Sequence, residues 1–310
     1  MFDDSPSKRF QARRRMPRLR KIAKRASAIL NPVSTVLARS TELVGYDRYR
    51  AIPVLMYHKI VDSGPEIRQL NYYVSRSAFE RQMEHLSRNN YTALSVEQYA
   101  ACLQLGIDWP CKSVLITFDD GYSGIASIAY PILKNYGLKA VVFLPYNYIG
   151  QKQPFPWEKS RITPVDPLYE QLRPLSWEEV NEIKDVVSIG SHSVSHFLLA
   201  KAEPDIIRHE IAESKALIEN KIGEDVISFS YPGGVPEHGA MNDTTRKALQ
   251  DAGYKVAFYS EIGRNAANSD PYLQRRIVVA DNDSAGVFRA KLSGAFDWMR
   301  PFQRCFHKLF

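Results

Sequence analysis

From residue 52 onward, short apolar segments alternate with longer segments in which apolar residues recur at helical spacing. Short apolar runs rich in β-branched residues are typical of buried strands, and their alternation with helices predicts parallel strand pairing. A closed barrel and an open doubly wound sheet fit this alternation nearly equally well. The seven predicted strands are 52–57, 113–118, 139–144, 185–190, 225–230, 255–259 and 276–279.

Capping residues and terminating glycines predict the helices between these strands. Ser77 and Ser95 are expected to begin two helices, and Ser176 with Glu179 forms a capping box for another. Further helices are expected at 123–136, 204–222 and 242–252.

The segment 145–174 is rich in proline and aromatic residues and interrupts the alternation as a long loop. Aromatic side chains here and just beyond can stack on a ring-shaped ligand or belong to the core, and the core interpretation carries somewhat more weight. These residues are Tyr146, Tyr148, Phe155, Trp157 and Trp177.

Positive charge is concentrated at the start of the chain. The formal net charge is +7, but residues 1–30 hold ten Lys or Arg against two Asp, so the remaining 280 residues sum to −1. Residues 1–50 are therefore expected to form a basic N-terminal arm, in which 8–30 can contact an anionic membrane as an amphipathic helix. A solvated extension is the simpler interpretation. Nucleic-acid binding is not expected, because no recognised module accompanies the charge.

The sequence contains no apolar run of the roughly 18 residues that a membrane-spanning helix needs. The apolar stretch after the basic start, Ala26–Leu30, is too short for a signal peptide because Asn31 and Pro32 interrupt it. Three scattered cysteines show neither metal-binding spacing nor a disulfide framework. These features predict a cytoplasmic protein, or one bound peripherally to the inner membrane.

Two acidic residues follow the predicted strand 113–118 in the sequence Thr117-Phe118-Asp119-Asp120-Gly121. In α/β barrels the carboxyl ends of the strands face the active site. Adjacent buried carboxylates repel each other, so a bound cation would stabilise them. An Asp-Gly turn whose carboxylates cap the next helix is an equally good interpretation of this segment alone.

His192 and His196 follow the predicted strand 185–190 in the same way. Histidines four residues apart on one helical turn point in the same direction and can share a metal ion, although a surface or core pair is the more frequent outcome. One carboxylate with two imidazoles is a catalytic rather than a structural ligand set, because it leaves coordination positions open for water and substrate.

Two further strands end in residues that can contribute to catalysis. Pro232 and Gly233 force the backbone to turn beside the barrel mouth, where the N–H of Tyr231 can bind an oxyanion of the substrate. A simple glycine turn is the alternative. His58, after the first strand, can protonate a leaving amine, and a buried structural histidine is the alternative for this residue.

Together these segments resemble carbohydrate esterase family 4, the polysaccharide deacetylases, over roughly residues 52–280. The family motifs T-F-D-D-G and H-[ST]-x-x-H match residues 117–121 and 192–196. The resemblance implies a deformed (β/α) barrel at 51–285, followed by a C-terminal extension at 286–310. It also implies metal-dependent hydrolysis of the acetamide of N-acetylated sugars, in a polysaccharide or a lipid-linked glycan.

By resemblance, Asp119 is the general base, and Asp120, His192 and His196 are the ligands of one divalent metal ion. Zn²⁺ is the leading candidate, although this ligand set suits several ions. Most family members carry an R-x-P-Y third motif and a later L-x-H segment, and this chain has neither. A glycan-binding module with a degenerate, inactive barrel is the alternative, although all five chemical positions are present.

The poly-N-acetylglucosamine deacetylases, a permuted branch of the family, resemble the chain more closely. They have a Y-P-x-G third motif and an L-x-Y-H histidine on the first strand, which Leu55–His58 matches. This makes His58 the expected general acid. Since the third motif lacks its arginine, Arg275 or Arg276 at the start of the last strand is a candidate to orient Asp119.

Overall fold

The computed structural model describes residues 51–62, 70, 72–159, 161–235 and 241–300. The predicted basic arm at 1–50, including its amphipathic helix at 8–30, lies outside the described residues. In the described part of the chain, no helix combines the length and apolar character that crossing a bilayer requires.

The centre of the molecule is a sheet of eight parallel strands in the order β12-β10-β9-β8-β7-β6-β2-β13. Their bounds are β2 Val54–Tyr57, β6 Ser113–Phe118, β7 Ala140–Leu144, β8 Val187–Ser191, β9 Ser228–Ser230, β10 Val256–Tyr259, β12 Gln274–Arg275 and β13 Ile277–Val278. Three minor pairings join β1 Ala51–Ile52 to β11 Asn265–Ala266, β3 Lys59–Val61 to β4 Tyr73–Ser75, and β5 Thr92–Ala93 to β6.

The two edge strands of this order are neighbours in sequence, since only Arg276 separates β12 from β13. Gln274 pairs with Phe258 of β10, whereas Ile277 pairs with Leu55 of β2. The segment 274–278 thus pairs on both sides and closes the sheet into a nearly complete barrel. The barrel prediction is confirmed, and the open sheet is excluded.

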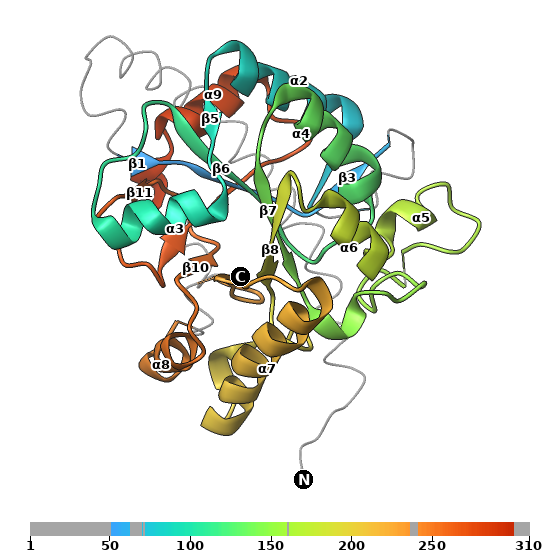
Figure 1. Cartoon of the computed structure of the whole chain (residues 1–310). Coiled ribbons are helices and arrows are strands. Elements are labelled where there is room, and N and C mark those ends of the chain that lie inside the picture. Colours follow the sequence, from blue (N-terminus) through green and yellow to red (C-terminus); the bar gives the residue numbers. More distant parts are fainter. Residues whose placement is uncertain (1–50, 63–69, 71, 160, 236–240, 301–310) are drawn as a thin grey trace, which may run out of the picture.

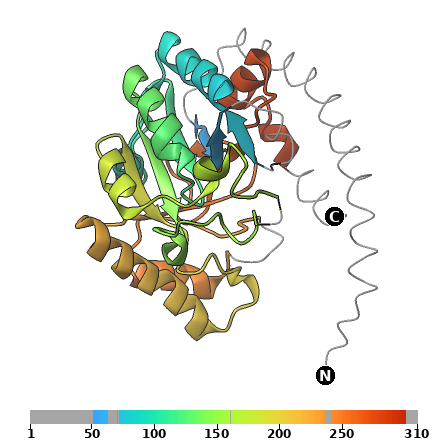
Figure 2. The ribbon, with the colours of Figure 1, turned by 90° about the vertical axis from the view of Figure 1, so that its right-hand side faces the viewer.

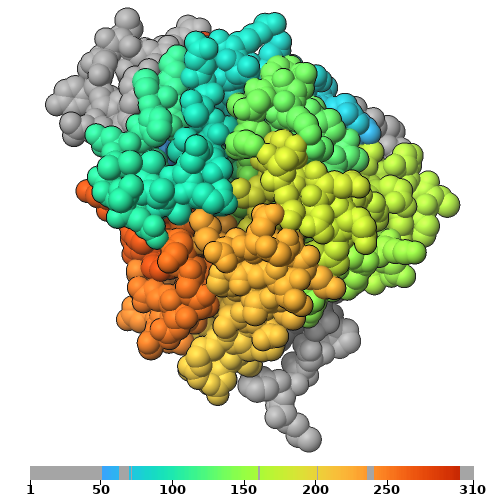
Figure 3. Space-filling model, in the orientation of Figure 1, coloured from blue at the N-terminus to red at the C-terminus, as the bar shows by residue number. Residues whose placement is uncertain are grey.

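Helices cover the outside of the barrel (Figure 1). They are α2 Arg76–Arg88, α3 Val96–Leu105, α4 Tyr130–Tyr136, α5 Tyr169–Leu172, α6 Trp177–Ile183, α7 Pro204–Ile222, α8 Asp243–Asp251 and α9 Ala285–Ser293. Cyan α2, green α4, yellow α6 and gold α7 follow one another along one side of the strands (Figure 2). In the space-filling view these helical segments lie against one another and cover that face (Figure 3).

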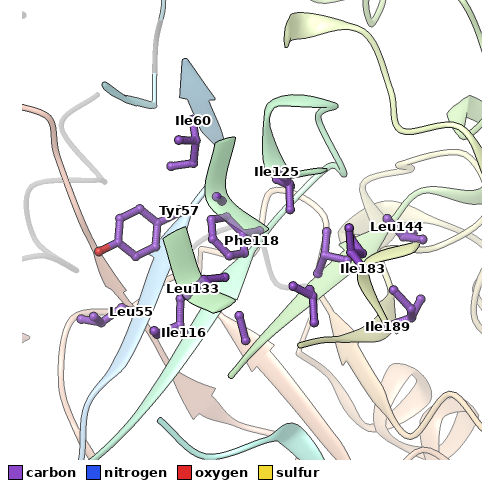
Figure 4. Packing of buried hydrophobic residues seen from close by; sticks show 14 of the residues in the cluster. Leu55, Tyr57, Ile60, Ile116, Phe118, Ile125, Leu133, Leu144, Ile183 and Ile189 are labelled. Atoms are coloured by element: carbon purple, nitrogen blue, oxygen red, sulfur yellow. The ribbon is translucent and has the colours of Figure 1, made fainter. Parts of the chain in front are cut away.

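Successive strand residues face opposite sides of the barrel wall, which divides the buried side chains into two sets. One set packs outward against the helices. Figure 4 shows part of it, with Leu55, Tyr57, Ile60, Ile116, Phe118, Ile125, Leu133, Leu144, Ile183 and Ile189 labelled. The other set, which includes Val54, Leu115 and Phe143, packs with Tyr99 of α3 and with Trp109. Helix α3 therefore closes the barrel at the end where the strands begin.

Several predicted element boundaries differ from the structure. Helix α2 begins two residues earlier than predicted because Ser75, not Ser77, is its N-cap: the Ser75 hydroxyl accepts a hydrogen bond from the Ala78 N–H, and Asp281 binds Ser75. The predicted helix at 123–136 is a π-helical turn at Ile125–Ala129 followed by α4.

The C-terminal residues predicted as an extension pack on the barrel as far as they are described. Helix α9 begins at Ala285, and its Phe288 and Leu292 belong to the main core cluster. Arg264 also forms an ion pair with Asp297 at 2.9 Å. Helix α9 was not predicted, because no strand follows it to mark it as part of the alternation.

Candidate active site

Predicted site residues that follow three different strands lie together at the carboxyl end of the barrel. His58 follows β2, the Asp119–Asp120 pair follows β6, and His192 follows β8. They line one cavity of about 580 Å³, which is within the ordinary range for small-molecule pockets. Its other predicted members are His196, Tyr231 and Gly233.

Asp120, His192 and His196 form a cluster, called the ligand cluster below, whose potential ligand atoms all lie within 4.8 Å of one another. The His196 Nε2 is 3.3 Å from Asp120 Oδ1, and the His192 Nε2 is 3.7 Å from the same oxygen. Tetrahedral ligands about 2.0–2.1 Å from a zinc ion lie about 3.4 Å apart. The residues present therefore fit a single divalent metal ion.

The two histidines converge through a loop, not through the predicted helical turn, since residues 192–196 are not helical. Ser193 and His196 have φ angles of 67° and 58°, and Asp120 has a φ angle of 71°. Such left-handed backbone costs a residue with a β-carbon about 1–3 kcal/mol and is frequent at functional sites. Two of the three residues of the ligand cluster are thus held in strained backbone.

The His192 ring is oriented by the backbone of the neighbouring strand. Its Nδ1 donates a hydrogen bond to the Ser230 carbonyl oxygen at 2.7 Å, which leaves the Nε2 lone pair facing Asp120. Burial lowers the pKa of His192 to about 4, so the imidazole is neutral at physiological pH. A neutral imidazole with its second nitrogen fixed by an acceptor is the form that binds metal ions.

Asp119 is held by an arginine from the closing segment of the barrel. Arg276 Nη1 and Nη2 donate to the two Asp119 carboxylate oxygens at 2.6 and 2.8 Å, and Nη2 also donates to Ser230 Oγ at 2.9 Å. Burial acts to raise the Asp119 pKa, but the Arg276 charge, followed by His192 and His58, leaves it below the usual value. Of the two candidate arginines, Arg275 binds Glu261 instead, at 3.1 Å.

His58 lies on the same carboxylate, with its Nε2 3.9 Å from Asp119 Oδ2. Its ring stacks on Tyr72 at a centroid distance of 5.0 Å and an interplanar angle of 21°. Burial lowers the His58 pKa, and the negative charges of Asp119 and Asp120 oppose that effect. The predicted acid and the predicted base are therefore neighbours in one cavity.

The Tyr231 backbone N–H does not have the freedom that its predicted role requires. It donates to the Phe258 carbonyl oxygen at 3.0 Å, because β9 and β10 continue to pair at this residue. The Tyr231 hydroxyl donates to the Tyr272 carbonyl oxygen at 3.0 Å. In this structure, the Tyr231 N–H is thus not available to an oxyanion, although Tyr231 itself lines the cavity.

Comparison with known proteins identifies the family of this chain. The model of the family described as polysaccharide deacetylase matches residues 107–257. The Bacillus subtilis protein YxkH, which is named for the same family, is 31% identical over 240 residues, covering 77% of this chain and 75% of its own. The chain belongs to the polysaccharide deacetylase family.

Two further proteins are similar to this polysaccharide deacetylase. The poly-β-1,6-N-acetyl-D-glucosamine N-deacetylase of Staphylococcus aureus (strain COL) is 28% identical, covering 68% of this chain and 69% of its own. The structure of the Streptococcus pyogenes deacetylase PplD in complex with acetate has a TM-score of 0.65 and 26% identity, covering 78% of this chain and 98% of that one. The predicted resemblance is confirmed, and the family identifies a carbohydrate deacetylase.

The polysaccharide deacetylase site also contains one of the five aromatic residues named from the sequence and a glutamate that the sequence did not single out. Trp157 is the aromatic residue of the 145–174 loop that lines the cavity, and its ring lies 4.7 Å from that of His196. The adjacent Glu158 is fully buried, and its Oε1 lies 2.5 Å from the Lys59 Nζ. The Tyr122 hydroxyl donates to the same Glu158 oxygen at 3.2 Å. These contacts attach the loop to the strand that follows His58.

The other aromatic residues of this region pack in the core or at its edge. Phe155 is buried, and Tyr148 packs beside it in a small cluster that also contains Tyr122. Tyr146 and Trp177 pack against the main core cluster. Of the five aromatic residues predicted to bind sugar or to form the core, Trp157 alone lines the cavity described here.

Proposed function

We propose that this polysaccharide deacetylase hydrolyses the acetamide of N-acetylated sugars in a glycan, using one divalent metal ion held by Asp120, His192 and His196. The observation that carries the proposal is the pairing of two units in one cavity. The first is the ligand cluster, and the second is the adjacent Asp119, held ionised by Arg276. The similarity to a poly-N-acetylglucosamine N-deacetylase supports an N-acetylated substrate.

A metal ion held by Asp120, His192 and His196 would supply Lewis acidity, which would polarise the acetyl carbonyl and favour attack by water. Asp119 acts as the general base and accepts a proton from the attacking water. For this role its carboxylate must be charged and fixed in direction, and the two Arg276 hydrogen bonds provide both conditions.

Cleavage of the carbon–nitrogen bond requires a proton on the departing nitrogen, since an amide anion is a very poor leaving group. His58 faces the same cavity and lies 3.9 Å from Asp119, so its protonated form can donate this proton while Asp119 holds the proton from water, and Asp119 can then return a proton to His58. The products are acetate and the free amine of the sugar.

Aromatic rings on the cavity wall suit a sugar substrate. Tyr72 and Trp157 both line the cavity, and each packs against a histidine of the site. The apolar face of a pyranose ring packs well on such rings, and sugar hydroxyls can bind Arg161, a partly exposed charged residue that also lines the cavity. The chemistry of this wall accommodates a polymeric or a lipid-linked glycan.

The test is acetate release by the full-length, Zn²⁺-loaded protein from a panel of glycans. The panel contains N-acetylglucosamine oligomers of increasing length, a lipid-linked N-acetylhexosamine and an O-acetylated polysaccharide. Asp119→Asn and His192→Ala should abolish release, and Asp108→Asn, an exposed aspartate away from the cavity, is the matched control. Glycan binding without acetate release from any substrate would instead identify a non-catalytic glycan-binding module.

A further inference from the structure

Glu210 is a buried carboxylate on α7 that does not line the cavity. It is 6% exposed and lies in the stripe of the helix that faces the barrel, which otherwise consists of Ile207, Ile211, Ser214, Ile218 and Ile222. A charged side chain in such a stripe is costly unless strong donors satisfy its oxygens. The identity of its donors therefore indicates what the residue is for.

The Glu210 carboxylate accepts three hydrogen bonds from the segment between the two histidines of the ligand cluster. Its Oε2 accepts hydrogen bonds from the backbone N–H groups of Val194 and Ser195 at 3.0 and 2.9 Å. Its Oε1 accepts a hydrogen bond from the Ser195 hydroxyl at 2.6 Å. Hydrogen bonds to an ionised carboxylate are the stronger kind, so Glu210 fixes this short loop firmly.

The rest of the loop backbone is also paired. The Ser193 N–H donates to Ser191 Oγ at 3.2 Å, and the carbonyl oxygens of Ser193 and Val194 accept from the N–H groups of Tyr146 and Asn147. Glu210 is the acceptor that binds two consecutive N–H groups of the loop. Because Ser193 and His196 have left-handed φ angles, the loop needs such external support to keep its shape.

The two histidines are held in different ways. The His192 ring is fixed by the Ser230 carbonyl oxygen, and its backbone N–H by the Leu144 carbonyl oxygen at 2.9 Å. His196 directly follows Ser195, so its position depends on the residues that Glu210 binds. Loss of Glu210 would therefore displace His196 and leave His192 in place.

We infer that Glu210 is a positioning residue that sets the separation of His196 from His192 and Asp120, and thereby the affinity of the site for its metal ion. The inference rests on the proposed function, since it assumes that the ligand cluster holds a metal ion. It assigns to the long helix α7 a role in the site, although α7 contributes no residue to the cavity.

The test compares Glu210→Gln with Glu213→Gln in the full-length protein. Glutamine preserves the shape of the side chain but loses the charge and presents an amide NH₂ to the loop. Glu213 is exposed on the same helix and is the matched control. Zn²⁺ affinity is measured by competition with a chromophoric chelator, and E210Q is expected to bind about 10- to 100-fold more weakly than wild type. E213Q should bind Zn²⁺ like the wild type.

A second readout separates positioning from general destabilisation. At saturating Co²⁺, the visible absorption of E210Q should differ from that of the wild type, because the ligand geometry has changed. In the metal-free protein, amide hydrogen exchange should accelerate in a peptide covering residues 193–196 and remain unchanged in the β6 and α3 peptides. An unchanged Co²⁺ spectrum together with a Zn²⁺ affinity within twofold of wild type would overturn the inference.

If E210Q does not fold, Ser195→Ala provides the test, since it removes only the 2.6 Å hydrogen bond to Glu210. S195A should weaken Zn²⁺ binding severalfold, and wild-type affinity in S195A would overturn the inference. Failure of the proposed function is distinguishable, because the wild-type protein would then neither bind Zn²⁺ nor release acetate.

Discussion

Removal of the Arg276 side chain should expose how strongly the site depends on its buried ion pair. The side chains of Arg276 and Asp119 are 0% and 4% exposed, and two hydrogen bonds of 2.6 and 2.8 Å join them. Arg276→Met retains much of the aliphatic volume but leaves the Asp119 carboxylate buried without its partner. Loss of one partner of a buried pair costs about 3–5 kcal/mol of stability.

The same substitution should impair catalysis. Asp119 loses both hydrogen bonds that direct its carboxylate, and a displacement of about 1 Å of a catalytic group costs about 100-fold in rate. Acetate release by R276M is therefore expected to fall by about this factor. Arg275→Met is the matched control, because Arg275 binds Glu261 and the contacts of Asp119 remain intact.

The stability loss should depend on pH in a defined direction. In the wild type the folded-state pKa of Asp119 is lowered, so the pair stabilises the protein above the unfolded-state pKa of about 3.9 and loses this effect as the pH falls through the lower folded value. In R276M the arginine charge no longer offsets the effect of burial on Asp119, so the folded-state pKa of Asp119 rises. The difference in free energy of unfolding between the wild type and R276M should therefore be largest at neutral pH and shrink as the pH falls toward about 4.

Urea unfolding of the metal-free proteins at pH 7.5 and at pH 5 measures this difference, and the D119N/R276M double variant completes the cycle. The double variant should be more stable than R276M alone, because it no longer buries an unpaired charge. The reasoning is refuted if the free energy of unfolding of R276M at pH 7.5 lies within about 1 kcal/mol of the wild-type value, because loss of one partner of a buried pair requires a difference of about 3–5 kcal/mol.

Three other changes test separate parts of the structure. Treatment with a chelator should abolish acetate release and added Zn²⁺ should restore it; full activity of metal-free protein would contradict the proposed metal site. Lys59→Met should cost about 3–5 kcal/mol in urea unfolding, and K59M/E158Q should recover part of this loss, since it leaves no unpaired charge. Gly124→Ala should destabilise more than Gly223→Ala, because its β-carbon would lie 2.0 Å from the Ile60 carbonyl oxygen, whereas that of Gly223 meets nothing within 4 Å and adds only the strain of a φ angle of 72°. Equal urea midpoints for the two glycine variants would contradict the steric argument.

Much of the barrel could be predicted from the sequence because its strands are buried on both faces. In the sequence such strands appear as continuous apolar runs, and the predicted strand 113–118 coincides with β6. The residues of the ligand cluster were predicted to converge for the same reason: Asp120 and His192 come directly after strands, and parallel strands end at one edge. The structure places them as this argument requires.

The remaining features depend on contacts that are distant in sequence. The Tyr231 N–H is occupied because β10, some 25 residues later, extends its pairing by one residue, and nothing near Tyr231 indicates this. The left-handed φ of His196 replaces the expected helical turn, because the loop is shaped by partners on α7 and after β7. Glu210 did give a local signal, since it is an acidic residue within the apolar stripe of a helix.

The closed barrel also explains how the site can contain its arginine although the third motif lacks one. Closure places the last strands beside the first, so the segment 274–278 lies between β2 and β10, and only β10 separates it from β9. Arg276 lies at the point where this segment changes partners, between β12 and β13, and its guanidinium bridges Asp119 and the Ser230 hydroxyl at the end of β9. The role of a charged side chain in such a barrel depends on where it lies at the mouth, and every strand ends at the mouth. The arginine can therefore come from a different strand, provided that it meets the carboxylate in the same buried geometry.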